Sequence, residues 1–209
     1  RVNPHLAVGP AHCAISNSLV NDASTDYEIE KAIVLDIAPV SYLNDERWTI
    51  PNLIRAMNEL PMDFTAGYRT RNHVDQFMSK YVSDKRIRLF LASNLVRRPD
   101  NTGWQWSHNH AVLRTSVDMI GGFPSYFTGE NNHGASPAGY DTVNKYDGDV
   151  LFIRGGNSFY CYDPYEREID RLFSNYAIET IPGAGHWVHS DNPQRFLNLV
   201  SMYVNNELR

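Results

Sequence analysis

Short apolar runs rich in β-branched residues recur along the chain, and each predicts a buried β-strand. They span residues 6–8, 31–40, 149–155 and 176–183. Within these runs the apolar residues are mostly consecutive and do not alternate with polar ones, which is typical of parallel strands covered on both faces. The pattern therefore predicts four strands of a parallel sheet.

Helical patterns follow three of the predicted strands, at residues 14–21, 164–173 and 194–206. An alternation of buried strands with helices is the signature of an α/β fold around a parallel sheet. We therefore predict an α/β fold for the chain.

The C-terminal helix has a clear start. Asn192 supplies a capping side chain, and Pro193 follows at the first helical position, where its missing N–H costs nothing. The residues expected to form the buried face of this helix are Phe196, Leu197, Val200 and Val204.

A long insertion separates the second and third predicted strands. It is mostly helical, because apolar residues recur at spacings of three and four, as on one face of a helix. Two such stripes consist of Val74, Phe77, Met78 and Tyr81, and of Ile87, Leu91 and Leu95. We predict that residues 41–147 form a helical cap with a loop tail rich in Gly, Asn and Pro, and that residues 1–40 and 148–209 form the core.

Composition narrows the function classes. The 209 residues carry a net charge of −5 with no basic block, so nucleic-acid binding is not expected. No apolar stretch is long enough for a membrane span. Cys13 and Cys161 are too few and too far apart for a disulfide framework. The pairs Gly121-Gly122 and Gly155-Gly156 are isolated and do not form a glycine-rich phosphate-binding loop, so we expect no cofactor. His108 and His110 would point to different faces of a helix, so we expect no metal.

Two residues at predicted strand ends could carry acid–base chemistry. His186 lies in Gly183-Ala184-Gly185-His186-Trp187, a loop at the carboxyl end of the sheet where α/β folds place ligands, and a histidine there suits a general base. Asp36 lies within an apolar run, where a carboxylate is costly unless it is paired. An imidazole is the expected partner. The alternatives are a surface histidine at position 186 and a turn-capping carboxylate at position 36.

The N-terminal segment has the pattern of a strand, a tight turn and a helix. In serine hydrolases such a turn carries Gly-x-Ser-x-Gly with the nucleophile at its apex. Here the five residues are Gly9-Pro10-Ala11-His12-Cys13, so Ala11 occupies the serine position. The other candidate nucleophiles are less well placed than position 11 to occupy the apex of the turn. They are His12, Cys13, Ser16, Ser18 and Ser136. Of these, Cys13 is near the apex but two residues beyond it.

Several segments together resemble one known family. They read VLDIAPV, RAMNELP, LFLASNLV, WQW, LFIRGGNS, EIDRLF and IPGAGHWVHSDNPQRF. From about His5 to the C-terminus the chain is similar to the abhydrolase domain-containing protein 11 family of the α/β-hydrolase superfamily, whose fungal members include ethanol acetyltransferases.

This resemblance implies an α/β-hydrolase fold with a helical cap. It also implies serine-dependent cleavage or transfer of small acyl esters or thioesters, with Asp36 as the acid and His186 as the base of a Ser-His-Asp triad. A mitochondrial location is implied as well. Many α/β-hydrolases place their acid after the strand at 149–155, where this chain has Asn157 and Ser158, and this favours Asp36 as the acid.

The chain departs from the family pattern at two points, and these departures leave two hypotheses about its function. Ala11 replaces the elbow serine, and the chain begins at the strand that leads into the elbow, so we expect the N-terminal strands of the fold and one oxyanion-hole loop to be absent. We therefore expect the chain to come from a hydrolase or acyltransferase lineage and to be inactive as written. The alternative is a non-catalytic relative or fragment that acts in binding or assembly, with a protein partner covering the exposed edge strand.

Overall fold

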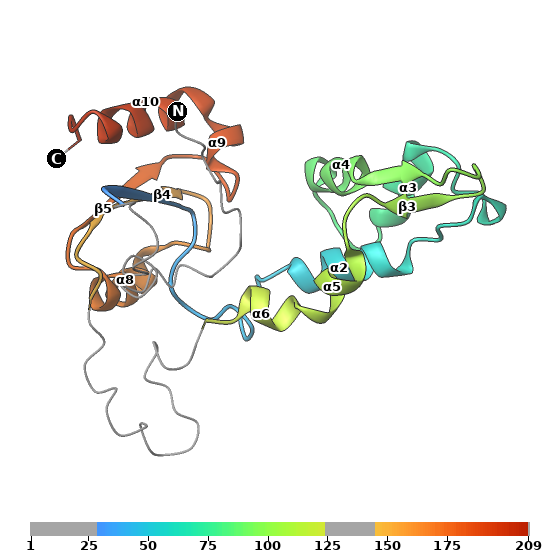
Figure 1. Ribbon diagram of the computed structural model, residues 1–209, viewed down its shortest axis with the longest axis horizontal. Coiled ribbons are helices and arrows are strands. Elements are labelled where there is room, and N and C mark those ends of the chain that lie inside the picture. The colour runs from blue at the N-terminus through green and yellow to red at the C-terminus, as the bar shows by residue number, and fades with distance from the viewer. Residues whose placement is uncertain (1–28, 124–144, 209) are drawn as a thin grey trace, which may run out of the picture. The chain divides into compact units, whose positions relative to one another are not determined.

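The computed structural model describes residues 29–123 and 145–208, which form two compact units. The sheet unit comprises the described residues 29–42, 122–123 and 145–208. The helical unit spans Leu43–Gly121 (Figure 1). The predicted strand at 6–8, the turn at 9–13, the helix at 14–21 and the loop residues 124–144 lie outside the described residues.

The sheet unit is built on three parallel strands at three of the predicted runs, but the first ends at Leu35 instead of Val40 and the last at Ile181 instead of Gly183. They are β1 (Lys31–Leu35), β4 (Asp149–Gly155) and β5 (Tyr176–Ile181), in the order β1-β4-β5. The register places Ala32 opposite Val150 and Val150 opposite Tyr176. The predicted α/β class is confirmed.

Helices cover both faces of β4, and its side chains alternate between two apolar clusters. Leu151 and Ile153 pack on one face with Leu199 and Tyr203, whereas Phe152 lies on the opposite face. The helices on the first face are α9 (Val188–Asp191) and α10 (Pro193–Val204). On the opposite face lies α8 (Glu166–Leu172), preceded by the short 3₁₀ helix η2 (Asp163–Tyr165) (Figure 1). Burial on both faces explains why β4 is a continuous apolar run.

Helix α10 begins as predicted, and its predicted buried face is confirmed in part, because Phe196 and Val200 are partly buried against the core. The Asn192 side chain accepts a hydrogen bond from the backbone N–H of Arg195, and Pro193 is the first residue of the helix. The prediction for Leu197 and Val204 is wrong, because their side chains are 59% and 58% exposed. The stripes 197/200/204 and 196/199/203 are both compatible with helical spacing. Docking on β5 buries Leu199 and Tyr203 of the second stripe, and it partly buries Phe196 and Val200, which the sequence predicts on the buried face.

The helical unit contains five α-helices, one 3₁₀ helix and one two-stranded hairpin. Its elements are α2 (Ile50–Glu59), η1 (Phe64–Ala66), α3 (Arg71–Met78), α4 (Lys85–Ser93), β2 (Leu95–Arg97), β3 (Trp104–Trp106), α5 (His110–Thr115) and α6 (Val117–Gly121). This unit falls inside the segment 41–147 that is predicted to be a cap. No helix in the described part of the chain is both long and apolar enough to cross a membrane.

The predicted apolar stripe is confirmed for Val74, Phe77 and Met78, which lie on α3 and are buried in the core of the helical unit. It is wrong for Tyr81, which lies beyond the end of α3 and is partly buried. The helix predicted through Leu95 is wrong at its end. Helix α4 stops at Ser93, and Leu95 is the first residue of the antiparallel hairpin, where it remains fully buried. Spacing alone does not reveal the change of element, because burial continues across it.

Candidate active site

Asp36 follows directly after β1 and takes an unusual backbone conformation. Its φ is +47°, in the left-handed region that most residues avoid but that Asp adopts more readily. Its backbone N–H donates to the carbonyl oxygen of Ile153 (2.8 Å), so the last ladder bond to β4 is kept while the chain turns away. The residue is buried, with 1% of its surface exposed. This turn fixes a carboxylate at the carboxyl end of the sheet.

The buried carboxylate of Asp36 has three hydrogen-bond partners. Oδ1 accepts from the backbone N–H of Gly155 (2.8 Å), and Oδ2 accepts from the hydroxyl of Ser158 (2.5 Å). Nδ1 of His186 lies 2.8 Å from the same Oδ2. Hydrogen bonds of this number and length compensate for the loss of water around a buried charge. The carboxylate is therefore held in one orientation.

His186 is placed by a loop between β5 and α9 that packs tightly on the loop after β4. A Cβ on Gly155 would lie 2.2 Å from the carbonyl oxygen of Gly185, so only glycine permits this approach. The backbone N–H of Asn157 donates to the carbonyl oxygen of Ala184 (2.9 Å), and the Asn157 side-chain amide donates to that of Gly183 (3.1 Å). These contacts lock the two loops together and bring His186 to Asp36.

Aromatic packing supports the imidazole from one side. The ring of Tyr160 lies 4.1 Å from that of His186, centroid to centroid, at an interplanar angle of 33°. The carbonyl oxygen of Tyr160 accepts from the buried hydroxyl of Tyr42, which also accepts from the N–H of Ala38 (2.9 Å). Burial raises the pKa of Tyr42 far above its usual range, so its hydroxyl keeps its proton. Tyr42 thus ties the segment after β1 to the residue that supports His186.

Cys161 lies near the same carboxylate but is not set up for nucleophilic chemistry. It is 1% exposed, and burial, together with the negative charge of Asp36, raises the pKa of the thiol to about 12. The reactive form of cysteine is the thiolate. At neutral pH Cys161 is a protonated core residue.

The arrangement of Asp36 and His186 favours one imidazole tautomer. A carboxylate only accepts hydrogen bonds, so the ring donates from Nδ1 and leaves the lone pair of Nε2 free to take a proton. The Asp36 side chain is fully buried, whereas the His186 side chain is 43% exposed. The group that would take the proton is therefore the one that solvent and ligands can reach. This geometry can perform general base catalysis on a group that approaches Nε2.

Of the residues singled out in the sequence, the structure brings Asp36 and His186 together in the sheet unit. Ala11, Cys13 and the other elbow residues lie outside the described residues. His108 and His110 belong to the helical unit with ring centroids 6.0 Å apart, and in the described residues no group of three or more His, Cys, Asp or Glu side chains is arranged to hold a metal.

Sequence reasoning missed the contact between Ser158 and Asp36. The available signal was the position of Ser158 just after the strand at 149–155, next to the end of the strand that carries Asp36. A hydroxyl at that position can donate to a carboxylate supplied by the neighbouring strand.

No protein-family model matches the chain, but its sequence is similar to several individual proteins. The mouse protein named sn-1-specific diacylglycerol lipase ABHD11 is 32% identical over 84% of this chain and 51% of its own length. Esterase YbfF of Escherichia coli is 27% identical over 85% of this chain and 58% of its own length. Ethanol acetyltransferase 1 of Wickerhamomyces ciferrii is 20% identical over 86% of this chain and 46% of its own length.

The solved structure of an esterase from a marine microorganism superposes with a TM-score of 0.67 at 25% identity, covering 82% of this chain and 59% of the esterase. The chain thus spans about half the length of the curated relatives it matches. The predicted α/β-hydrolase fold is confirmed. The chain has the α/β-hydrolase fold, and over most of its length its sequence is similar to ABHD11 and to esterase and acetyltransferase relatives.

Proposed function

We propose that this chain carries the acid and base of a serine-type ester or thioester hydrolase, with Asp36 as the acid and His186 as the base. The observation that carries the proposal is the 2.8 Å contact between Nδ1 of His186 and the fully buried Oδ2 of Asp36. A buried carboxylate bonded to a partly exposed histidine is what general base catalysis requires. The lipase and esterase names of the relatives support an ester substrate.

In the proposed reaction a serine hydroxyl attacks the acyl carbon of the substrate. Its proton moves to Nε2 of His186, and Asp36 stabilises the imidazolium that forms. When the tetrahedral intermediate collapses, the bond to the leaving alcohol or thiol breaks, and His186 returns the proton to that group. Water then attacks the acyl carbon of the acyl-enzyme and gives a proton to the same Nε2. The bond to the serine oxygen breaks, His186 returns the proton to that oxygen, and the acid is released. An alcohol in place of water would give acyl transfer.

The proposal assigns the nucleophile to position 11, where this sequence has alanine. The protein as written is therefore expected to lack turnover, while Asp36 and His186 remain arranged for it. The segment 41–147 is proposed to cap the cleft that receives the acyl chain, and the resemblance to the family supports a mitochondrial location. The acyl and alcohol groups are proposed to be small.

Ala11 also supports a second candidate, a binding or assembly protein that retains the hydrolase scaffold without catalysis. In that case an exposed strand edge of the sheet would be covered by a protein partner. The two candidates differ in whether the site regains chemistry when the hydroxyl is restored.

The test is the Ala11→Ser variant of the full-length protein, assayed for hydrolysis of p-nitrophenyl acetate and p-nitrophenyl butyrate. The double variant Ala11→Ser with His186→Ala is the matched control. We expect the single variant to exceed the unchanged protein by roughly a hundredfold or more, since a triad member typically contributes several orders of magnitude. We expect the control to lose that gain. A folded Ala11→Ser variant with no activity would refute the hydrolase proposal and favour the second candidate.

A further inference from the structure

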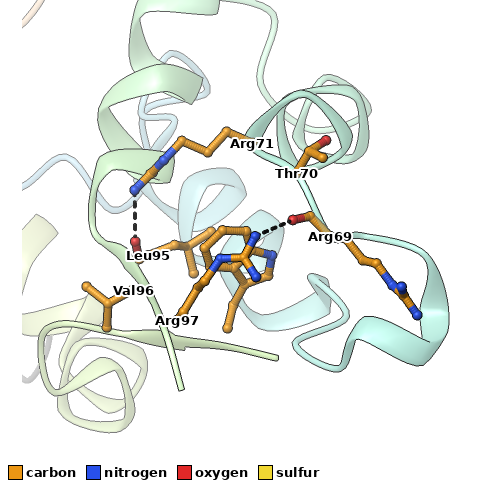
Figure 2. Close-up of a pocket in the computed structure, with 7 residues that line it drawn as sticks. Arg69, Thr70, Arg71, Leu95, Val96 and Arg97 are labelled. Atoms are coloured by element: carbon orange, nitrogen blue, oxygen red, sulfur yellow. Dashed lines mark hydrogen bonds between the residues drawn. The ribbon is translucent and has the colours of Figure 1, made fainter. Parts of the chain in front are cut away.

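A hollow of about 520 Å³ lies in the helical unit. Its lining includes three arginines, Arg69, Arg71 and Arg97, together with Thr70 and Trp104 (Figure 2). Small-molecule sites in proteins commonly measure roughly 300 to 1,000 Å³. The hollow is therefore large enough for a small organic molecule, and its polar lining is mostly cationic.

Two of these arginines bring their charge to the same indole ring. The guanidinium of Arg97 lies 5.3 Å from the centre of the Trp104 ring and that of Arg71 lies 5.9 Å from it. Arg71 stands at the start of α3 and reaches β2, where it donates to the carbonyl oxygen of Leu95 (3.1 Å). Figure 2 shows both guanidinium groups, with the Arg69 side chain extending away from them. Arg71 on α3 and Arg97 on β2 thus bring two positive charges to one indole ring.

The groups that bond to these cations are neutral. Arg97 donates to the side-chain oxygen of Asn101 (3.0 Å) and to the carbonyl oxygen of Arg69 (3.4 Å), and Arg71 donates to backbone carbonyls. Within the described part of the chain, no carboxylate forms an ion pair with Arg69, Arg71 or Arg97.

Other arginines of the same unit do have carboxylate partners. Arg88 pairs with Asp75 at 2.7 Å and Arg55 pairs with Glu59 at 2.7 Å. Carboxylate partners are therefore available within the unit, but the three arginines of the hollow, like Arg98 and Arg114, form no ion pair with a described carboxylate. Two like charges held near each other without a counterion repel, and an anion that binds between them would relieve that repulsion.

Charge is also segregated along the chain. Residues 43–121 contain eleven Lys and Arg against eight Asp and Glu, a net charge of +3, whereas the rest of the chain carries −8. The helical unit is thus the cationic part of an acidic protein. An anionic ligand is attracted to it and repelled by the remainder.

We propose that this hollow binds a small organic anion through its phosphate or carboxylate oxygens. Arg71 and Arg97 would hold the oxygens, since a guanidinium presents planar pairs of N–H donors that match both groups. The hydroxyl of Thr70 would add a donor, and the exposed side chain of Val96 would contact the apolar part of the ligand. This site lies beyond the proposed hydrolase function and does not depend on it.

The test is isothermal titration of the protein at low salt with pyrophosphate in one series and citrate in another. We expect binding with a dissociation constant below about 1 mM for at least one of them. The tighter probe identifies phosphate or carboxylate as the preferred group. Added salt is expected to weaken the binding, because exposed charges are screened.

Two variants locate the binding, and a third serves as the matched control. Arg97→Gln is expected to weaken binding roughly tenfold or more. Val96→Glu adds a carboxylate at an exposed lining position and is expected to abolish binding with little effect on folding. Arg55→Gln, on α2 outside the hollow, removes the same charge and is expected to change binding less than about twofold. Thermal melts of all three confirm folding.

Three results would overturn the proposal. The first is no binding of either anion up to about 10 mM. The second is equal weakening by Arg97→Gln and Arg55→Gln, which would mean that the anions respond to net charge alone. The third is unchanged binding to a folded Val96→Glu variant.

Discussion

Replacing Gly155 with alanine tests whether the close approach of two loops positions the candidate base. The new Cβ would lie 2.2 Å from the carbonyl oxygen of Gly185, a separation that real Cβ atoms essentially never show, since they stay beyond about 3.0 Å. The Gly185 loop must then retreat by roughly 0.8 Å. His186 is the next residue along the chain, so the displacement reaches the candidate base directly.

The expected effects follow from that displacement. If 0.8 Å is added along the contact between His186 and Asp36, its length grows from 2.8 Å to about 3.6 Å, outside hydrogen-bond range. Overpacking of this kind typically costs about 1–3 kcal/mol. For a protein of this length, that corresponds to a loss of roughly 2–12 °C in melting temperature.

Two measurements on Gly155→Ala are needed, a thermal melt and a proton NMR spectrum. The hydrogen-bonded Nδ1 proton of His186 should give a downfield resonance that is absent from a His186→Ala variant and is lost or shifted in Gly155→Ala. Gly156→Ala is the matched control, because its Cβ would meet its nearest neighbours at 3.3 Å and needs only a small adjustment. A Gly155→Ala protein with an unchanged melt and an unchanged His186 resonance would refute the reasoning.

Two further predictions concern the surroundings of Asp36. Ser158→Ala removes a hydrogen bond to a buried charge and should lower the unfolding free energy by about 1.5–3 kcal/mol. In the control Ser174→Ala the lost hydroxyl donates to a neutral carbonyl, so the expected loss is about 0.5–1.5 kcal/mol. Equal losses for the two variants in urea titrations would contradict this difference. Burial raises the pKa of Cys161 to about 12, so the thiol ionises more readily in the unfolded chain, and its contribution to stability should be complete below about pH 8.5 and decrease as the pH rises toward 12. Unfolding titrations from pH 8 upward should therefore show a steeper loss for the wild type than for Cys161→Ala, and parallel curves would exclude this effect.

The parts of the fold that the sequence predicts best are those where one physical requirement dominates. Strand β4 matches the run at 149–155 because burial on both faces requires apolar residues at nearly every position. The sequence also predicts a site residue at Asp36, because a carboxylate in an apolar run is costly unless it has a partner. His186 is its expected partner because its loop also lies at the carboxyl end of a predicted parallel strand.

The parts that the sequence does not predict depend on contacts between distant segments. The hairpin of β2 and β3 has three residues per strand, too few to show an alternating pattern. The buried face of α10 is decided by its docking on β5, because two stripes satisfy the helical spacing equally well. The bond from Ser158 to Asp36 joins residues 122 positions apart. The hollow at Arg71 and Arg97 likewise forms only when α3 meets β2.

The central claim is that His186, oriented by Asp36, is the base of a serine hydrolase whose nucleophile belongs at position 11. The most direct test is the intact mass of the Ala11→Ser protein before and after treatment with a fluorophosphonate, beside the same protein with His186→Ala. We expect one covalent adduct on the Ala11→Ser protein and none on the double variant. A folded Ala11→Ser protein that gains no adduct, or a double variant that gains the adduct equally, would contradict the central claim.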